Sequence, residues 1–127
     1  MTTSKTKVFR FTMLGLIAFG MAGLVAAQGN SRSFEASPDV YKVLAQSDQY
    51  LVIEITWKPG QRDQFHSHPA SGGYYLNDCK VRWHRPDGSS RDFTNPAGRA
   101  FALPPVESHS MENIGDSECR VIQFEPK

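Results

Sequence analysis

The chain has 127 residues, with 14 Lys+Arg, 13 Asp+Glu and a formal net charge of +1. This length accommodates one domain. The near-neutral charge excludes a protein that binds nucleic acid through a basic surface, because no surplus of positive charge exists to neutralise phosphates.

The N-terminal residues have the composition of an export signal. Basic residues precede residue 11, residues 11–27 carry no charge, and the last three of these are small. This pattern predicts a signal peptide over residues 1–27, cleavage before Gln28, and a periplasmic or secreted mature chain without a stable membrane span. A retained anchor is the alternative, but seventeen residues that include three glycines are short for a bilayer span. After cleavage the net charge is 11 − 13 = −2.

The rest of the chain has the pattern of an all-β protein. Residues 28–39 are polar and are interpreted as a loose lead-in to a single domain over residues 40–127. Apolar and polar residues alternate over residues 51–57, as expected for a half-buried strand. The other predicted strands are residues 40–44, 65–68, 74–76, 81–84, 100–103 and 120–124. Many short strands separated by turn-forming residues predict a small antiparallel β-barrel or jelly roll.

The two cysteines of the chain, Cys79 and Cys119, both lie in the exported part, where a disulfide is permitted. Alternation gives mixed indications about their pairing. Cys79 shares a strand face with Val81, whereas Cys119 lies on the face opposite to Ile122 and Phe124. A Cys79–Cys119 bridge and a pair of free thiols both remain open at this level.

Histidines supply the clearest candidate site. His66 and His68 lie two residues apart in a predicted strand, so both side chains leave the same face. His109 is expected in a further strand, just after residues 103–106. If these strands meet across a barrel, three neutral imidazoles can bind one divalent ion and leave positions for water or substrate. The alternative is that each histidine is an ordinary core or surface residue.

Two stretches resemble the paired motifs of the cupin superfamily, G-x5-H-x-H-x3,4-E-x6-G and G-x5-P-x-G-x2-H-x3-N. The matching positions are Gly60, His66 and His68 in the first motif and Gly98, Pro104, His109 and Asn113 in the second. The chain is therefore identified as a member of this superfamily, and the resemblance implies a single-domain β-barrel.

The glutamate of the first motif is missing, because Gly72 and Gly73 stand at its place. Asp63 and Glu107 are the nearest substitutes, but an empty position is preferred. Cupins without this glutamate resemble three-histidine iron enzymes, which include thiol dioxygenases and a β-diketone dioxygenase. The resemblance implies a mononuclear site on His66, His68 and His109, with Fe(II) first and Zn, Mn or Ni as alternatives. Three imidazoles leave the metal charge uncompensated, which favours an anionic or chelating substrate.

Three further residues, Gln64, Tyr74 and Tyr75, are candidate catalytic groups. Gln64 shares the strand face of His66 by alternation, and its amide would hold substrate or metal-bound water; a structural hydrogen bond is the alternative. One of the two tyrosines is expected to face the barrel as an acid or substrate anchor, with packing as the alternative. The large aromatic residues expected in the pocket wall or core are Trp83, Phe101 and Phe124.

Together these features predict an exported metal-binding cupin that acts as a dioxygenase-like enzyme on a small chelating or anionic molecule. The alternatives are a metal-dependent isomerase or lyase of a sugar acid, and a non-catalytic module that binds a small ligand or a metal. A homodimer is expected, since cupins often pair through their sheets. The arginines expected on a solvated face, or singly at the barrel mouth, are Arg82, Arg85, Arg91 and Arg99.

Overall fold

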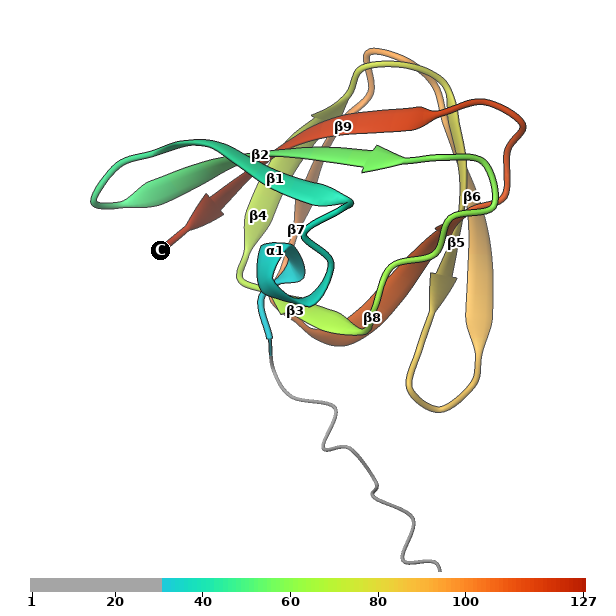
Figure 1. The fold of residues 1–127 in the computed structure, drawn as a ribbon, viewed down its shortest axis with the longest axis horizontal. Coiled ribbons are helices and arrows are strands. Elements are labelled where there is room, and N and C mark those ends of the chain that lie inside the picture. Colours follow the sequence, from blue (N-terminus) through green and yellow to red (C-terminus); the bar gives the residue numbers. More distant parts are fainter. Residues whose placement is uncertain (1–30) are drawn as a thin grey trace, which may run out of the picture.

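The computed structural model describes residues 31–127, a barrel of antiparallel strands preceded by one helical turn (Figure 1). The elements are α1 (Ser33–Ala36), β1 (Tyr41–Gln46), β2 (Tyr50–Trp57), β3 (His66–His68), β4 (Ser71–Tyr75), β5 (Cys79–His84), β6 (Ser90–Asn95), β7 (Ala100–Leu103), β8 (Val106–Asn113) and β9 (Cys119–Pro126). The predicted signal peptide lies outside the described residues. Within residues 31–127 no helix has the length and apolar character to cross a membrane.

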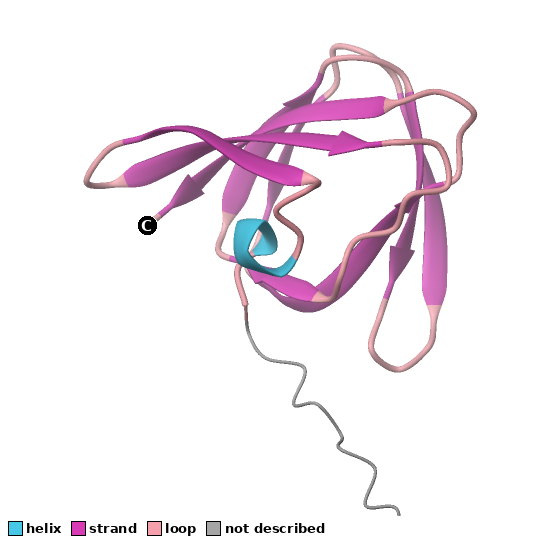
Figure 2. Cartoon of the chain, in the orientation of Figure 1, coloured by secondary structure: helices cyan, strands magenta, loops and turns pink. Residues whose placement is uncertain are grey.

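The strands form two sheets that enclose the interior (Figure 2). One sheet has the order β1-β2-β9-β4-β7 and the other has the order β3-β8-β5-β6. Strands far apart in the chain, such as β2 and β9, are neighbours, because the chain crosses repeatedly between the sheets. This is the winding of a jelly roll, and the predicted all-β fold is confirmed.

Strand β2 provides the apolar centre of the core by simple alternation. Its inward residues Ile53, Ile55 and Trp57 are all buried, and residues between them are partly exposed. β2 pairs with β9 along the whole length of both strands. The alternation predicted for residues 51–57 is therefore confirmed.

Strand β9 turns an unexpected face to the interior. Its buried residues are Cys119, Val121, Gln123 and Glu125, whereas Phe124 is 48% exposed. The prediction that Phe124 lies in the pocket wall or core is wrong, because two inward positions of this strand hold polar side chains. The apolar residues Ile122 and Phe124 therefore mark the outer face.

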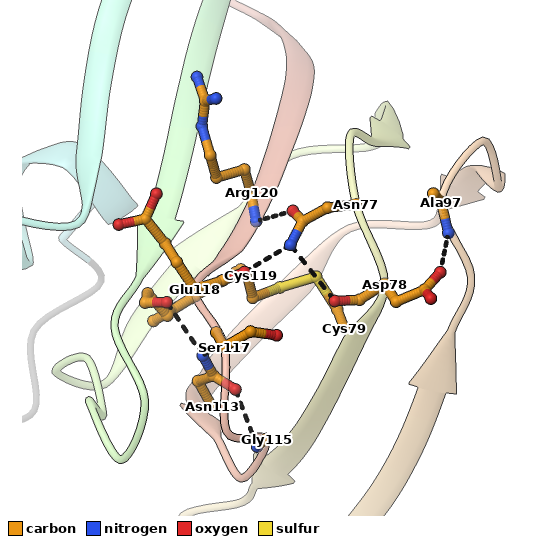
Figure 3. Close-up of a disulfide and its surroundings, with 11 residues drawn as sticks. Asn77, Asp78, Cys79, Ala97, Asn113, Gly115, Ser117, Glu118, Cys119 and Arg120 are labelled. Atoms are coloured by element: carbon orange, nitrogen blue, oxygen red, sulfur yellow. Dashed lines mark hydrogen bonds between the residues drawn. A yellow bond between two sulfur atoms is a disulfide. The ribbon is translucent and has the colours of Figure 1, made fainter.

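A disulfide joins Cys79 to Cys119, with the two Cα atoms 5.1 Å apart (Figure 3). Because β5 and β9 belong to different sheets, the bond links the two sheets where both strands begin. Asn77 supports this corner, since its Oδ1 accepts a hydrogen bond from the Arg120 amide at 2.8 Å and its Nδ2 donates to the Glu118 carbonyl. Both cysteines face inward, which resolves the question that alternation leaves open.

Residues 31–39 pack against the barrel, whereas the sequence predicts a loose lead-in. The Ser67 amide donates to the Ser31 carbonyl at 3.0 Å, and the Gln64 amide donates to the buried Ser37 hydroxyl at 2.8 Å. Phe34 of α1 packs against the core. The polar character of this segment reflects hydrogen bonding to the backbone on both sides of His66, rather than exposure to solvent.

Removing the disulfide should destabilise the fold. The bond closes a loop of 40 residues. For a loop of that size the chain-entropy model gives roughly 4 kcal/mol of stabilisation. We expect the Cys79→Ala/Cys119→Ala double variant to unfold at a clearly lower urea concentration, by an amount that corresponds to about 2–5 kcal/mol. The wild-type protein kept under reducing conditions is the control and should behave in the same way. An unchanged urea midpoint would contradict the assignment of a stabilising bridge between the sheets.

Candidate metal centre

Three histidines gather in the barrel interior from two neighbouring strands. His66 and His68 lie on β3, and His109 lies on β8 directly opposite His66 in the antiparallel register. One ring nitrogen from each residue lies within 4.8 Å of the others. All three side chains are buried. The strands therefore meet as the spacing predicts, and they present a group that is able to hold a metal ion.

The protonation of His66 is set by the backbone just before its strand. Its Nδ1 lies 2.7 Å from the carbonyl oxygen of Gln64, and a carbonyl only accepts, so the ring proton is on Nδ1. Burial lowers the pKa of His66 below 6.5, although the nearby Asp63 carboxylate opposes the shift. The ring is therefore neutral at pH 7, and its unprotonated Nε2 lies 2.9 Å from Nε2 of His68.

A buried carboxylate sets the orientation of His68. Nδ1 of His68 donates to Oε1 of Glu125, and Oε2 of Glu125 accepts from the Arg32 guanidinium at 2.7 Å. Burial by itself raises the pKa of Glu125, but the hydrogen bonds from His68 and Arg32 outweigh it and leave the pKa below 4.5. Glu125 is therefore ionised at pH 7 and directs Nε2 of His68 toward His66. A carboxylate behind a histidine is a common support for a metal ligand.

His109 is positioned by packing. The Trp83 ring stacks on it, with the ring centroids 4.1 Å apart and the planes inclined by 18°. Nδ1 of His109 is buried and has no hydrogen-bond partner among residues 31–127. Burial, followed by the neighbouring imidazoles of His66 and His68, lowers the pKa of His109 to about 2. The ring is therefore neutral, and it keeps a buried polar nitrogen whose bonding is unsatisfied.

The donor set fits a divalent transition metal. Hydrogen bonds hold the protons of His66 and His68 on Nδ1, so the two Nε2 lone pairs converge. The unsatisfied nitrogen of His109 is consistent with a ring placed for ligation rather than for hydrogen bonding. Neutral imidazoles suit Zn, Fe and Ni, and a set of three protein ligands leaves coordination positions open.

Asp63 lies beside His66, but its carboxylate is fully engaged. Oδ2 accepts hydrogen bonds from the Tyr41 hydroxyl at 2.7 Å and from Nε1 of Trp57 at 3.0 Å. Oδ1 accepts from the backbone amide of Met111 at 2.7 Å. These contacts tie β1, β2 and β8 together behind the histidines. Asp63 is therefore a structural crosslink and does not replace the missing glutamate.

One of the two candidate places of the missing glutamate, residue 73, is closed to a side chain. A Cβ atom on Gly73 would lie 2.3 Å from the Phe101 ring and 2.7 Å from the Ile122 carbonyl oxygen. A Cβ atom on Gly72 would meet only the Phe101 carbonyl oxygen, at 3.6 Å. Phe101 thus fills the space in which a side chain at residue 73 would begin. Glu107, the other substitute considered from the sequence, is exposed on β8.

A cavity of about 160 Å³ adjoins the histidines. His68, His109 and Gln123 contribute polar groups to its lining. Most of the wall is apolar, and its aromatic residues are Tyr41, Trp57, Tyr75, Trp83, Phe93 and Phe101. An apolar cavity of roughly 150 Å³ is large enough to bind benzene. The barrel therefore offers space for one small ring next to the three histidines.

The structure separates the three residues predicted to be catalytic. Tyr75 lines the cavity, whereas Tyr74 is 47% exposed, so one tyrosine of the pair faces the barrel as expected. Gln64 is exposed, and only its backbone supports the site, through the carbonyl that accepts from His66. The predicted inward orientation of Gln64 is wrong because β3 begins at His66, so strand alternation does not extend back to residue 64.

Sequence reasoning missed the residues that support and line the site from distant elements. Arg32 and Glu125 hold His68, Tyr41 contacts Nε2 of His66 at 3.2 Å, and Gln123 lines the cavity. For β9 the sequence does contain an indication. Residues 123 and 125 lie on the same strand face as Cys119, so a disulfide at Cys119 would place both polar side chains in the interior. Arg32 lies in a polar segment that has no local indication of burial.

Comparison with protein families decides where the chain belongs. A protein-family model described as "Cupin domain" matches residues 53–124. The chain is a cupin. The matched segment runs from β2 into β9 and contains the three clustered histidines, His66, His68 and His109. At the level of sequence, no curated protein matches this cupin.

Solved structures share the fold of this cupin at low sequence identity. A cupin domain from Bordetella pertussis Tohama I has a TM-score of 0.63 and 20% identity, covering 69% of this chain and 92% of its own. A Klebsiella pneumoniae protein with a double-stranded β-helix domain has a TM-score of 0.54 and 20% identity, and the match covers 68% of this chain and 76% of that protein. The polyketide cyclase RemF from Streptomyces resistomycificus has a TM-score of 0.51 and 21% identity, and the match covers 68% of this chain and 63% of that protein. At these identities the likeness concerns the fold alone.

The motif residues that are not ligands form the turns that position the strands. Gly60 and Gly98 have φ values of +75° and +83°, a region that favours glycine. Asn113 donates through Nδ2 to the carbonyls of Trp57 and Ser117, and its Oδ1 accepts from the Gly115 amide. The Asn113 side chain therefore holds the turn between β8 and β9.

A methyl group at residue 73 should be far more damaging than one at residue 72. We expect Gly73→Ala to lose about 1–3 kcal/mol of stability, because overpacking forces Phe101 and the β9 backbone to move. Gly72→Ala is the matched control and should unfold close to wild type, since its new methyl group makes only an ordinary contact. Equal urea midpoints for the two variants would show that Phe101 does not close this position.

Neutralising the carboxylate behind His68 should weaken metal binding without unfolding the barrel. Glu125→Gln keeps the shape of the side chain but removes the charge that holds the proton of His68 on Nδ1, so we expect Zn(II) affinity to fall by roughly 10- to 100-fold. Competition with a chromophoric chelator measures this affinity. Glu118→Gln, at an exposed residue just before β9, is the control and should bind zinc as wild type does. A wild-type affinity in Glu125→Gln would remove Glu125 from the metal centre.

Proposed function

We propose that this cupin is an exported, mononuclear metal-dependent enzyme with dioxygenase-like activity on a small chelating or anionic molecule. The observation that carries the proposal is the convergence of three imidazoles, on His66, His68 and His109, beside a cavity with room for one small molecule. Fe(II) is the preferred metal, and Zn, Mn and Ni are alternatives. A bound metal would polarise the substrate and act as a Lewis acid. In a dioxygenase both atoms of O₂ enter the substrate, so no external reductant is needed.

The protein's own groups provide a site that favours negative charge. Two buried carboxylates lie near the histidines, and one of them, Glu125, is paired with Arg32. A divalent ion would therefore leave the centre with an excess of positive charge, even with Asp63 counted. An anionic oxygen of the substrate offsets this excess in a place that water reaches poorly. Gln123 also lines the cavity, but its Nε2 already donates to Oγ of Ser71 at 3.0 Å and to Oε1 of Glu125 at 3.1 Å.

The lining of the cavity favours an oxygenase over an isomerase or lyase of a sugar acid. Proton abstraction from a sugar acid requires a general base near the substrate. Among the described residues, no carboxylate lines the cavity. Burial raises the pKa of the Tyr75 hydroxyl above 10.0, although Arg99 opposes the shift, so this group is a proton donor rather than a base. The mostly apolar wall also suits a ring better than a polyhydroxylated chain. A non-catalytic binding module would use the same ligands and is distinguished by assay.

Loss of the histidines should abolish stoichiometric metal binding. The mature protein should bind one Fe(II) or Zn(II) per chain, and His66→Ala, His68→Ala and His109→Ala should each reduce the metal content strongly because one of three ligands is removed. Metal analysis after equilibrium dialysis measures the content. His84→Ala is the control, because His84 pairs with Glu112 outside the cluster and should leave binding intact. Full metal content in the triple variant would refute the site.

Activity separates the enzyme from the binding module. Anaerobically Fe(II)-loaded protein should consume O₂ when a chelating acid is added, and the His109→Ala variant should not. Iron binding without O₂ uptake across a panel of chelating acids would favour the non-catalytic alternative. Export is tested by the mass of the mature N-terminus, which should begin at Gln28. The homodimer is tested by sedimentation.

A further inference from the structure

The cavity is lined by polar side chains other than those of the histidines. Arg99 and Asn95 both line the cavity, and Nη1 of Arg99 donates to Oδ1 of Asn95 at 2.8 Å. Asn95 is buried, whereas Arg99 is exposed. The buried amide therefore anchors an exposed guanidinium at the rim of the cavity. This arginine is the member of the predicted group of four that the structure places at the cavity.

Arg99 is the arginine that lines the cavity, and it has no carboxylate partner among the described residues. Arg32, Arg82 and Arg120 each pair with a carboxylate, at 2.7, 2.7 and 2.5 Å, whereas Arg62, Arg85 and Arg91 lie outside the cavity lining. No carboxylate of residues 31–127 pairs with Arg99. The Arg99 guanidinium is thus held at the cavity by the neutral amide of Asn95, and its remaining N–H groups are available to bind an external anion. A guanidinium binds a carboxylate with two parallel hydrogen bonds, which gives direction as well as attraction.

Flat aromatic side chains make up much of the lining around Arg99 and the histidines. Trp83 stacks on His109. Tyr75 lies on the strand segment that pairs with Arg99, because its amide donates to the Arg99 carbonyl at 3.0 Å. The Tyr75 ring in turn contacts the Phe101 ring, with centroids 5.6 Å apart. These aromatic faces suit a planar ring.

We propose that the cavity binds a single-ring aromatic carboxylic acid, with its carboxylate against Arg99 and its hydroxyl oxygens directed toward the histidines. This assignment rests on the proposed function for the metal-binding end, but the carboxylate end stands on Arg99 alone. The volume of about 160 Å³ accommodates one ring. A substrate of this class is anionic, planar and chelating when it carries two adjacent hydroxyl groups.

Calorimetric titration of the Zn(II)-loaded full-length mature protein tests the proposal without redox chemistry. Three probes are compared. 3,4-Dihydroxybenzoate carries both a carboxylate and two chelating hydroxyl groups, catechol lacks the carboxylate, and benzoate lacks the hydroxyl groups. We expect 3,4-dihydroxybenzoate to bind most tightly. Arg99→Gln should weaken its binding roughly tenfold, the scale of a lost charge-assisted pair, and should leave catechol within about twofold. Arg99→Lys keeps the positive charge but loses the planar guanidinium. Its affinity for 3,4-dihydroxybenzoate should therefore lie between those of the wild type and Arg99→Gln.

The controls separate this proposal from the proposed function. Arg82→Gln removes an arginine that pairs with Asp92 outside the cavity, and it should bind all three probes as wild type does. Equal thermal midpoints for Arg99→Gln and wild type show that the variant is folded. If zinc does not bind, the proposed function fails, and benzoate is titrated into the metal-free protein, where its affinity should still depend on Arg99.

Two results would overturn the assignment while leaving the metal site intact. One is a zinc-loaded protein that binds 3,4-dihydroxybenzoate no better than catechol. The other is an Arg99→Gln variant with unchanged affinity for 3,4-dihydroxybenzoate and benzoate. The absorption spectrum of the Co(II)-loaded protein adds an independent readout, because it should change with catechol and 3,4-dihydroxybenzoate but change little with benzoate.

Discussion

The constraint on which the site depends is the position of two protons. His66 and His68 place their Nε2 atoms 2.9 Å apart in a buried interior, so both rings must carry the proton on Nδ1 if both are to bind a metal. The Gln64 carbonyl fixes one proton and the Glu125 carboxylate fixes the other. The carbonyl acts locally, whereas the carboxylate must be brought from the last strand and kept ionised by Arg32. Much of the architecture around β3 follows from that second requirement.

Placing a carboxylate in the wall costs the barrel part of its core. The inward positions of β9 that hold Gln123 and Glu125 are positions that apolar residues would otherwise fill, and a domain of this size has few to spare. The same strand begins at Cys119, whose disulfide holds it to the opposite sheet. Asp63 adds a second crosslink through Tyr41 and Trp57. The disulfide and the buried hydrogen bonds of Asp63 thus compensate for a core that has few apolar residues.

The parts of the fold that could be predicted from the sequence are those encoded by short-range patterns. Alternation identifies β2, and motif spacing identifies His66, His68 and His109, because strand geometry and turn glycines impose fixed offsets. The support from Arg32 and Glu125 depends on which strands become neighbours, and no local pattern encodes that. Gln64 shows the other limit, because it lies two residues before β3 and the alternation of that strand does not extend to it. The exposed Phe124 shows that hydrophobicity alone misassigns a strand whose inner face holds polar side chains.

The Arg32–Glu125 pair also imposes an order of events on biosynthesis. Its partners are 93 residues apart in the chain, close to the two ends of the folded domain. A contact of such long range forms only once nearly all of the chain is available and its loops have closed. A chain that emerges gradually from the ribosome therefore presents both histidines of β3 well before Glu125, which supports His68, has been made. For the metal site that we propose, this order means that the complete set of supporting contacts exists only after the last strand has docked.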